Sequence, residues 1–365
     1  MPRLLEAYVL DQYGLDLTAY YAGDLRVRNP FGKASGQLSL NVRQVHADAQ
    51  AGLGFVVLKT VIAVDDSGSA SMSDWAVPVT KMTVEPIVGQ SGEPGWTVSW
   101  VGRGWSESFE QYLAFFDEAL VIGAAADMLV VPSVKYHLPG PNEAEWRIHE
   151  YAFTTRELFK VWRRHHPTAP MPLEKDFSPT LAGDDRATDR DRVLEWVRAA
   201  PRLIHSAVAS DPATSGRDAR PTTVLVGLKL FNALADDDFQ LELLRTADES
   251  EADFLIYGNR LFDPQRGLAY GGPDLSDRNL LALRRYRERY GSLRKPLSAT
   301  GNIHCGAMAG AYTRLGADSF QMHTLFQLPD ECFTKRDGSR AEKALHHLLF
   351  HPETGWIADR LSEVG

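Results

Sequence analysis

Short apolar runs rich in β-branched residues recur along this chain and alternate with longer segments of helical period. Several runs are apolar at every position, which is typical of parallel strands buried on both faces. We expect eight strands, at residues 30–35, 54–59, 128–134, 171–176, 223–230, 254–257, 297–300 and 319–323. Helices are expected at 38–51, 108–123, 144–165, 189–210, 237–247, 275–290 and 307–315. This alternation predicts a parallel (β/α)8 TIM barrel. A doubly wound open sheet shares the pattern, but no Gly-x-Gly-x-x-Gly follows the first strand.

Two kinds of segment interrupt the alternation. Residues 61–106 show little helical period and contain β-rich runs at 82–88 and 96–101, which predict an antiparallel excursion after strand two. Segments 178–190 and 209–221 are rich in Asp, Pro and Arg and are expected to be loops, the first a candidate lid. We therefore expect one domain over 1–365 with a β-rich insertion at about 61–106.

Composition narrows the class of protein. With 365 residues, 44% of them apolar and 24% charged, the chain suits a globular barrel with insertions. A net charge of −9 argues against nucleic acid or an anionic membrane as partner. Cys305 and Cys332 are the only cysteines, too few for a disulfide framework and without metal-site spacing. No signal peptide or run of 18 apolar residues is found, so a cytoplasmic location is expected.

The last two expected strands end in small residues, Thr300-Gly301-Asn302 and His323-Thr324. Adjacent parallel strands that end in exposed backbone N–H groups and lead into helices can hold a dianion. In a (β/α)8 barrel a phosphate usually lies at the loops after the last two strands. The pattern predicts a phosphate-bearing ligand, most often a cofactor, although glycines that only form tight turns would look the same.

Further segments occur in a characteristic order: the stretch from Asp16 to Gly36, Gly52–Thr60, Val226–Leu230, Gly258–Phe262, Gly271-Gly272 and the two strand ends above. Together, from Leu15 to about Gln327, they resemble the dihydroorotate dehydrogenase-like family of FMN-dependent barrels, which includes the pyrimidine-reducing domain of dihydropyrimidine dehydrogenase. The resemblance implies an oxidoreductase acting on a CH–CH bond. FMN would be bound non-covalently, and a hydride would move between flavin N5 and a carbon of a small organic substrate.

The resemblance also implies where the cofactor is held. Lys59 and Lys229 end otherwise apolar strands, where an ammonium could stabilise the negative N1–C2=O edge of reduced flavin. Lysines that reach solvent at a strand end would fit the same positions. Asn29-Pro30-Phe31 is interpreted as a structural start of strand one. The expected cofactor contacts are Ala34, Ser35, Gly36, Lys59, Thr60, Lys229, Gly258, Asn259, Gly271, Gly272, Thr300, Gly301, Asn302, His323 and Thr324.

The loop after strand four, Leu173–Thr180, resembles the family's Ser/Cys-Pro-Asn loop that carries the proton-transferring base. Ser178 then takes that role, with Lys175 and Lys59 completing the expected catalytic set. A serine hydroxyl is a poor base alone, so it needs a relay, for which Lys175, Asp176 and His304 are candidates. Ser-Pro is also a common turn signal. Tyr136 and His137 are reserve acid/base candidates.

The chain departs from the orotate-using members at the residues that hold the pyrimidine. The family's asparagines correspond here to Thr180, Lys175, Leu255-Ile256 and, loosely, residues 99–105. Trp100, Arg103 and Trp105 favour a larger or more apolar substrate, anionic through Arg103. The expected substrate contacts are Trp100, Arg103, Thr180 and Leu255.

Two alternatives stay open: a flavin-free lyase or aldolase that uses Lys229 as a Schiff-base lysine on a phosphorylated substrate, and a non-catalytic ligand-binding relative. The chain begins too close to its first hairpin for the membrane-docking extension of serine-type members, so a membrane quinone is not the expected oxidant. The electron donor or acceptor stays open, and a homodimer is expected by analogy only.

We predict that dihydroorotate is not a substrate. A buried polar group left without its partner costs about 1–3 kcal/mol, and about four such groups on the pyrimidine would lose theirs. Steady-state assays with dihydroorotate and an artificial electron acceptor check this. A kcat/KM of about 10⁴ M⁻¹s⁻¹ or above, as is ordinary for enzymes, would contradict it.

Overall fold

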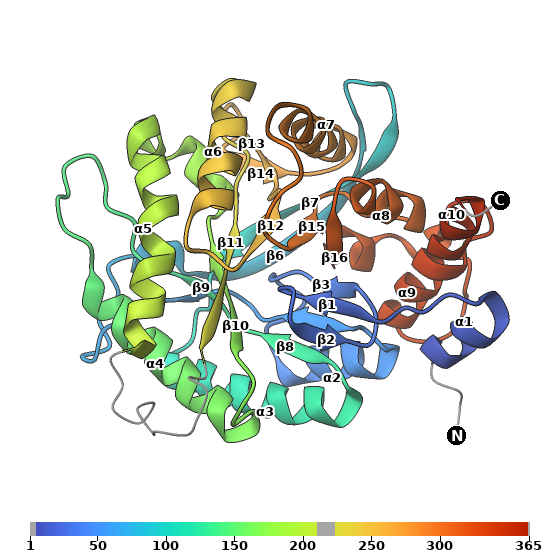
Figure 1. Cartoon of the computed structure of the whole chain (residues 1–365), viewed down its shortest axis with the longest axis horizontal. Coiled ribbons are helices and arrows are strands. Elements are labelled where there is room, and N and C mark those ends of the chain that lie inside the picture. The colour runs from blue at the N-terminus through green and yellow to red at the C-terminus, as the bar shows by residue number, and fades with distance from the viewer. Residues whose placement is uncertain (1–4, 210–222, 364–365) are drawn as a thin grey trace.

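The computed structural model describes the backbone of residues 5–209 and 223–363, and their side chains except those of 78–81, 100–103 and 179. One parallel sheet forms the centre of the molecule (Figure 1). Its strands are β3 (Phe31–Lys33), β4 (Phe55–Val57), β5 (Val61–Ile62), β8 (Leu129–Val131), β9 (Ser133–Lys135), β10 (Met171–Asp176), β11 (Val224–Lys229), β12 (Phe254–Tyr257), β15 (Leu297–Thr300) and β16 (Ala317–Met322).

The sheet curls into a (β/α)8 barrel, as predicted. Its order is β5-β9-β10-β11-β12-β15-β16-β3-β4-β8, and the two ends meet because only Pro132 separates β8 from β9. On one side of this proline the Leu58 amide donates to Val131, and on the other the Glu174 amide donates to Pro132 itself. The bounds of β10, β12 and β15 are those predicted. The expected strand at 128–134 is interrupted at Pro132, which has no N–H to donate to the ladder.

Helices surround the barrel (Figure 1). Those predicted are present as α2 (Val42–Ala51), α3 (Phe109–Ala126), α4 (Ile148–His165), α5 (Arg190–Ala209), α6 (Asp237–Glu249), α7 (Pro273–Tyr290) and α8 (Gly306–Thr313). Short polar residues fix several starts: Ser108 forms a capping box with Gln111 at α3, and Asp236 accepts from the Phe239 amide at α6. No helix within the described ranges is long and apolar enough to cross a membrane.

A hairpin of β1 (Ala19–Tyr21) and β2 (Leu25–Val27) packs against the inner side chains of the barrel. The Tyr21 ring lies 4.7 Å from that of Phe55 and 5.1 Å from that of Phe254, between ring centroids. Three helices were not predicted: α1 (Leu5–Tyr13), α9 (Arg340–Phe350) and α10 (Trp356–Ser362). They lie together beside the barrel (Figure 1).

The antiparallel excursion predicted after strand two is present. It is a long hairpin of β6 (Val77–Val88) and β7 (Pro94–Arg103). A second hairpin that was not predicted, β13 (Leu261–Asp263) with β14 (Leu268–Tyr270), lies against β7. The expected loop 178–190 contains two short 3-10 helices, η2 (Pro179–Gly183) and η3 (Asp185–Ala187). Apart from residue 209, the expected loop 209–221 lies outside the described residues.

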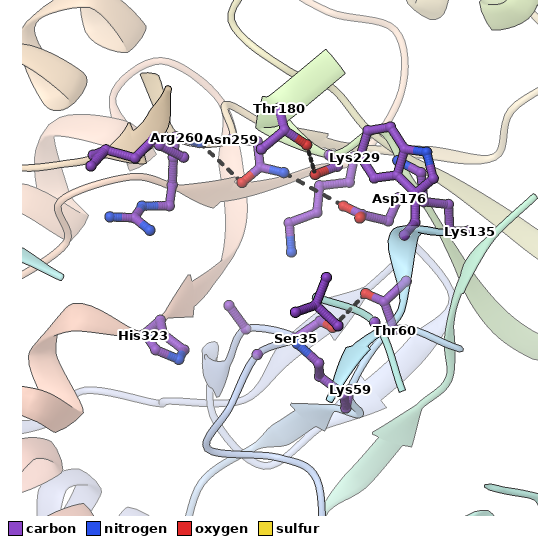
Figure 2. A pocket seen from close by; sticks show the side chains of 18 of the residues that line it. Ser35, Lys59, Thr60, Lys135, Asp176, Thr180, Lys229, Asn259, Arg260 and His323 are labelled. Carbon is purple, nitrogen blue, oxygen red and sulfur yellow. Dashed lines mark hydrogen bonds between the residues drawn. The ribbon is translucent and has the colours of Figure 1, made fainter. Parts of the chain in front are cut away.

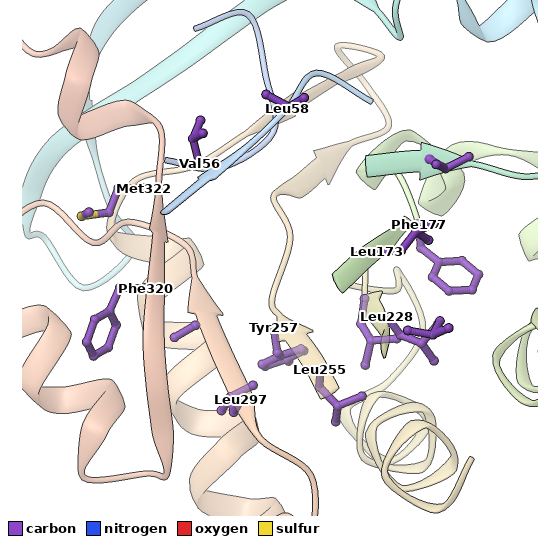
Figure 3. Close-up of a cluster of buried hydrophobic side chains, with 14 of the residues drawn as sticks. Val56, Leu58, Leu173, Phe177, Leu228, Leu255, Tyr257, Leu297, Phe320 and Met322 are labelled. Carbon is purple, nitrogen blue, oxygen red and sulfur yellow. The ribbon is translucent and has the colours of Figure 1, made fainter. Parts of the chain in front are cut away.

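Each strand sends alternate side chains to the barrel interior and to the layer beneath the helices. Figure 3 shows the helix-facing set, which includes Leu173, Leu228, Leu255, Leu297 and Phe320. These side chains are fully or almost fully buried and make the main core. Leu255 was expected to contact substrate. Its position on β12 directs it toward the helices instead, while its neighbours Phe254 and Ile256 face the interior.

The buried side chain of Asn29 joins three parts of the chain, in keeping with a structural role. Its Nδ2 donates to Glu6 on α1 and to the Gly52 carbonyl after α2, and its Oδ1 accepts from the Phe31 amide at β3. We predict that Asn29→Ala lowers the free energy of unfolding by about 3 kcal/mol, because it leaves buried partners unpaired. Urea unfolding measures this. Asn41→Ala, at the exposed N-cap of α2, is the control and should cost about 1 kcal/mol; equal losses would contradict the prediction.

Candidate functional site

A cavity of about 600 Å³ opens at the carboxyl ends of the barrel strands. This is the end of a (β/α)8 barrel at which active sites are built. Its floor consists of strand ends from around the barrel, and its outer wall comes from the β6–β7 and β13–β14 hairpins. The lining residues are Ala34, Ser35, Gly36, Lys59, Thr60, Ile62, Trp75, Val77, Thr83, Ser99, Gly104, Lys135, Asp176, Ser178, Thr180, Lys229, Asn259, Arg260, Gly267, Leu268, Ala269, Thr300 and His323.

The structure brings many of the expected site residues together in this cavity. The expected cofactor contacts that line it are Ala34, Ser35, Gly36, Lys59, Thr60, Lys229, Asn259, Thr300 and His323. Ser178 and Thr180 line it as well. The side chains of Trp100 and Arg103 lie outside the part that the structure describes, so the expectation that they contact substrate stays a prediction.

Other expected residues lie behind the lining. Gly258, Gly301 and Asn302 pack around Asn279 and Ser276 of α7, and Thr324 begins the short 3-10 helix after β16. Gly271 and Gly272 join the outer hairpin to α7: the Gly271 amide donates to Thr97 Oγ1, and a Cβ at Gly272 would lie 2.7 Å from Ile87. Their place in the fold accounts for both glycines without a ligand.

Positive side chains dominate the cavity although the protein as a whole is acidic. Lys59, Lys135, Lys229 and Arg260 line it, and Asp176 is the carboxylate among the described lining residues. Figure 2 shows Arg260 and His323 on one side, Lys135 and Asp176 on the other, and Lys229 between them. Like charges this close repel one another, so the arrangement favours an anionic ligand.

Lys59 shows the effect of these positive charges on a neighbouring amine. Burial, the largest cause, and the nearby Lys229 together lower the pKa of its amine to about 8, although Asp176 opposes the shift. No residue in the described part of the chain hydrogen-bonds to this amine, which therefore faces the cavity with its donors available. A negative group placed beside it would raise this pKa again and so would bind more favourably to the ammonium form.

Lys229 has a partner inside the barrel. Its Nζ lies 3.0 Å from Oε1 of Glu174, a fully buried carboxylate on the neighbouring strand β10. The second carboxylate oxygen accepts from Gln321 Nε2 at 3.0 Å. Glu174 thus balances one of the cavity's cations from below.

His323 lies at the end of β16, against the strand-one turn. A Cβ on Gly36 would be 2.6 Å from its ring, so only glycine permits this approach. Burial, and then the positive charges of Arg260 and the nearby lysines, lower the pKa of His323 to about 3. The imidazole is neutral at physiological pH.

Backbone donors gather beside His323, where the dianion cradle was expected. Gly301 and Asn302 follow β15 and have φ values of +114° and +52°, so the chain turns sharply at the end of this strand. Within the described residues, no hydrogen bond uses the backbone N–H of Gly301, Asn302 or Thr324. These N–H groups are therefore available to donate hydrogen bonds to an anion.

Ser178 and its neighbours form a polar edge of the cavity. Its Oγ lies 3.0 Å from Thr180 Oγ1. Asn259 Nδ2 reaches across from the strand-six loop to Asp176 Oδ1 at 3.5 Å and to the Phe177 carbonyl at 3.4 Å. Asn259 thus holds the strand-four loop in place, and Asp176 puts a carboxylate on the same edge as Ser178.

The remaining acid/base candidates point elsewhere. Lys175 is fully buried on the helix side of β10, where its amine donates to the Asp176 carbonyl and lies 4.4 Å from the Phe177 ring centroid. The buried Tyr136 hydroxyl is 2.6 Å from Thr155 Oγ1. His137 pairs with Glu143, and His304 contacts the Asn302 carbonyl. None of the four lines the cavity, so this placement supports a catalytic role for none of them.

Among the lining side chains that were not predicted as site residues, three carry charge or a large aromatic ring: Lys135, Trp75 and Arg260. Lys135 ends strand three as Lys59 and Lys229 end theirs, and that signal could have identified it. Its Nζ lies 3.4 Å from the Trp75 ring centroid. Trp75 lies in the irregular start of the insertion, and Arg260 follows a strand, so neither stood out. Within the described residues, no group of three or more metal-ligating side chains has the geometry of a metal site.

We predict that Lys175→Met stabilises the protein at pH 7. Burial lowers the pKa of Lys175 to about 7, against about 10.4 in an unfolded chain. Between these values the unfolded state binds a proton that the folded state lacks, so the lysine's penalty is full near pH 7 and is lost as pH rises. The variant should melt at least about 2 °C higher at pH 7 and gain less near pH 10. Thermal unfolding at both pH values measures this.

Lys160→Met is the matched control, since Lys160 is 61% exposed on α4 and its loss should change little. A Lys175→Met variant that melts below the wild-type protein at pH 7 would show that the amine makes a favourable interaction.

Comparison with known proteins supports the fold. No protein-family model and no curated protein matches the sequence. Among solved structures, the chain is similar to ligand-free DHODH (dihydroorotate dehydrogenase) from Eimeria tenella, with a TM-score of 0.61 and 14% identity over 100% of this chain and 96% of that one. It is likewise similar to DHODH in complex with ferulenol from the same organism, with a TM-score of 0.60 and 14% identity over 96% and 85% of the two chains. At this identity the likeness supports the fold alone, a (β/α)8 barrel.

Proposed function

We propose that this protein is an FMN-dependent oxidoreductase that transfers a hydride between flavin N5 and a carbon of a small organic substrate. The observation that carries the proposal is the cation-lined cavity beside unpaired backbone donors at the carboxyl ends of the last two strands. The DHODH-type barrel supports it, and the order of the sequence segments adds to that support.

The residues present fit FMN. Amides of Gly301, Asn302 and Thr324 would hold the phosphate, since backbone N–H groups without a partner at the ends of parallel strands suit a dianion. Small residues, Ala34 to Gly36, leave room for a flat ring system on the strand-one side of the cavity. Lys59 and Lys229 would balance the negative charge that a flavin gains on reduction. When bound, FMN supplies hydride chemistry.

The chain's own proton-handling groups lie on the Ser178 edge. A serine hydroxyl needs an acceptor to pass its proton on, and the neighbouring Thr180 hydroxyl can relay but not keep it. The Asp176 carboxylate lines the same edge, so we place the final proton acceptor there. Asn259 would orient this carboxylate through its Nδ2.

The outer wall indicates the kind of substrate. Ile62, Trp75, Val77 and Leu268 give an apolar surface, and Lys135 adds a positive charge over the Trp75 ring. Nothing in this set offers the row of amides that a diketopyrimidine requires. The surface favours a flat, largely apolar substrate that is not orotate.

The ion pair between Lys229 and Glu174 argues against the Schiff-base alternative. A Schiff-base lysine needs its amine free to attack a carbonyl carbon, whereas the amine of Lys229 is engaged by the buried Glu174 carboxylate at 3.0 Å. No observation favours the non-catalytic alternative.

We predict that the purified protein binds FMN and prefers it strongly to riboflavin. The two flavins share one ring system, so only the phosphate cradle distinguishes them, and the preference should be at least about 100-fold, or roughly 3 kcal/mol. Absorption bands near about 370 and 450 nm, which belong to oxidised flavin, and titration by fluorescence quenching measure binding.

Equal affinity for the two flavins would mean that the cradle does not hold the phosphate. A colourless protein that takes up no FMN would overturn the proposed function. Borohydride trapping of a substrate adduct on Lys229 would instead favour the lyase.

A further inference from the structure

The Glu174–Lys229 ion pair lies directly beneath the cavity. Lys229 is 4% exposed and lines the cavity, while Glu174 is fully buried below it. In the pairing of β10 with β11, Asp176 is the residue opposite Lys229, and Glu174 lies two residues before Asp176 on the same strand. The lysine therefore leans back into the barrel to meet Glu174 while its amine still borders the ligand space.

Side chains from other strands of the barrel hold the carboxylate in position. Oε2 of Glu174 accepts from Gln321 on β16, and Oε1 lies 3.4 Å from Ser133 Oγ on β9. The Ser133 Oγ is also within hydrogen-bond distance, 3.0 Å, of Thr60 Oγ1, and Thr60 lines the cavity. Contacts from β9, β11 and β16 thus converge on one carboxylate on β10, which fixes its distance from Lys229.

A buried carboxylate acts strongly on its surroundings because little water screens it. Its negative charge opposes the positive charge that Lys229 presents to anything above it. Burial and the charge of Glu174 also raise the pKa of Tyr21, inside the barrel, well above its usual value. The field of Glu174 therefore reaches across the barrel interior.

We propose that Glu174 is a positioning residue that sets the reduction potential of the flavin through Lys229. The inference rests on the proposed function. Two-electron reduction of a flavin with uptake of one proton adds one negative charge, which Lys229 would attract. Glu174 holds that lysine in place and offsets part of its charge, so it keeps the bound flavin harder to reduce than Lys229 alone would make it.

The test is the midpoint potential of bound FMN in the full-length protein, measured by equilibration with a reference dye. Glu174→Gln removes the negative charge but keeps the shape, so reduction should become more favourable by at least about tenfold, which is about +30 mV for a two-electron couple. Lys229→Met should shift the potential in the negative direction.

Controls separate charge from packing. Gln321→Met removes the hydrogen bond to Oε2 of the same carboxylate without changing the charge of the pair. It should leave the potential within about 10 mV of wild type, a twofold change in the equilibrium. In a Lys229→Met background, adding Glu174→Gln should shift the potential much less than it does in the wild-type protein, because the carboxylate then has no lysine to hold or to offset. Should Glu174→Gln fail to fold, Glu174→Asp draws the carboxylate back from Lys229 and should give a smaller positive shift.

The outcomes are distinct. A positive shift in Glu174→Gln that disappears without Lys229 supports the inference. Normal FMN binding with an unchanged potential overturns the inference alone, and a shift of the same size without Lys229 shows that Glu174 does not act through the lysine. A wild-type protein that binds no flavin overturns the inference together with the proposed function.

Discussion

Like charges that converge on one cavity are the constraint on which this site depends. Lys135 and Lys229 end strands, whereas Lys59 and Arg260 follow two other strands, and the closed barrel brings all four strand ends together. Such a cluster is stable only if charge of the opposite sign is available. Glu174 supplies part of it from inside the barrel and Asp176 part from the rim. The remainder favours an anionic ligand, which is why the cavity suits a cofactor that carries both a phosphate and a ring that gains charge.

The alternation of side chains along each strand decides which residues can take part. On β10, Glu174 and Asp176 face the interior, while Lys175 between them lies among the helices. The same alternation places Leu255 in the core and its neighbours inside the barrel. A shift of one residue in any strand would exchange these roles, because the side-chain period of a strand is two. The buried network around Glu174 therefore ties the register of the barrel to the chemistry above it.

Two hairpins complete the site from outside the barrel. The β6–β7 hairpin supplies Thr83 and Ser99, and the β13–β14 hairpin supplies Leu268 and Ala269. They are linked where the Gly271 amide meets Thr97, and Arg260 ties the strand-six loop to the Val98 carbonyl. The floor provides most of the charge, which suits the proposed cofactor, and the hairpins add both polar and apolar side chains that would contact the substrate.

The sequence alone determined the barrel, the excursion after strand two and most of the strand-end residues that meet in the cavity. It could do so because continuous apolar runs, helical period and lysines at strand ends are local signals. Tertiary structure decided which strand-end residues face the ligand space. Lys175 and Asp176 are adjacent in sequence, and only the position of β10 in the closed barrel sends one into the core and the other into the cavity. The tertiary structure also brings Glu174 to Lys229, 55 residues away, and places Trp75 and Arg260 at the lining of the same cavity. Such pairings depend on how elements that are distant in the sequence come together in the fold, which no local pattern of residues encodes.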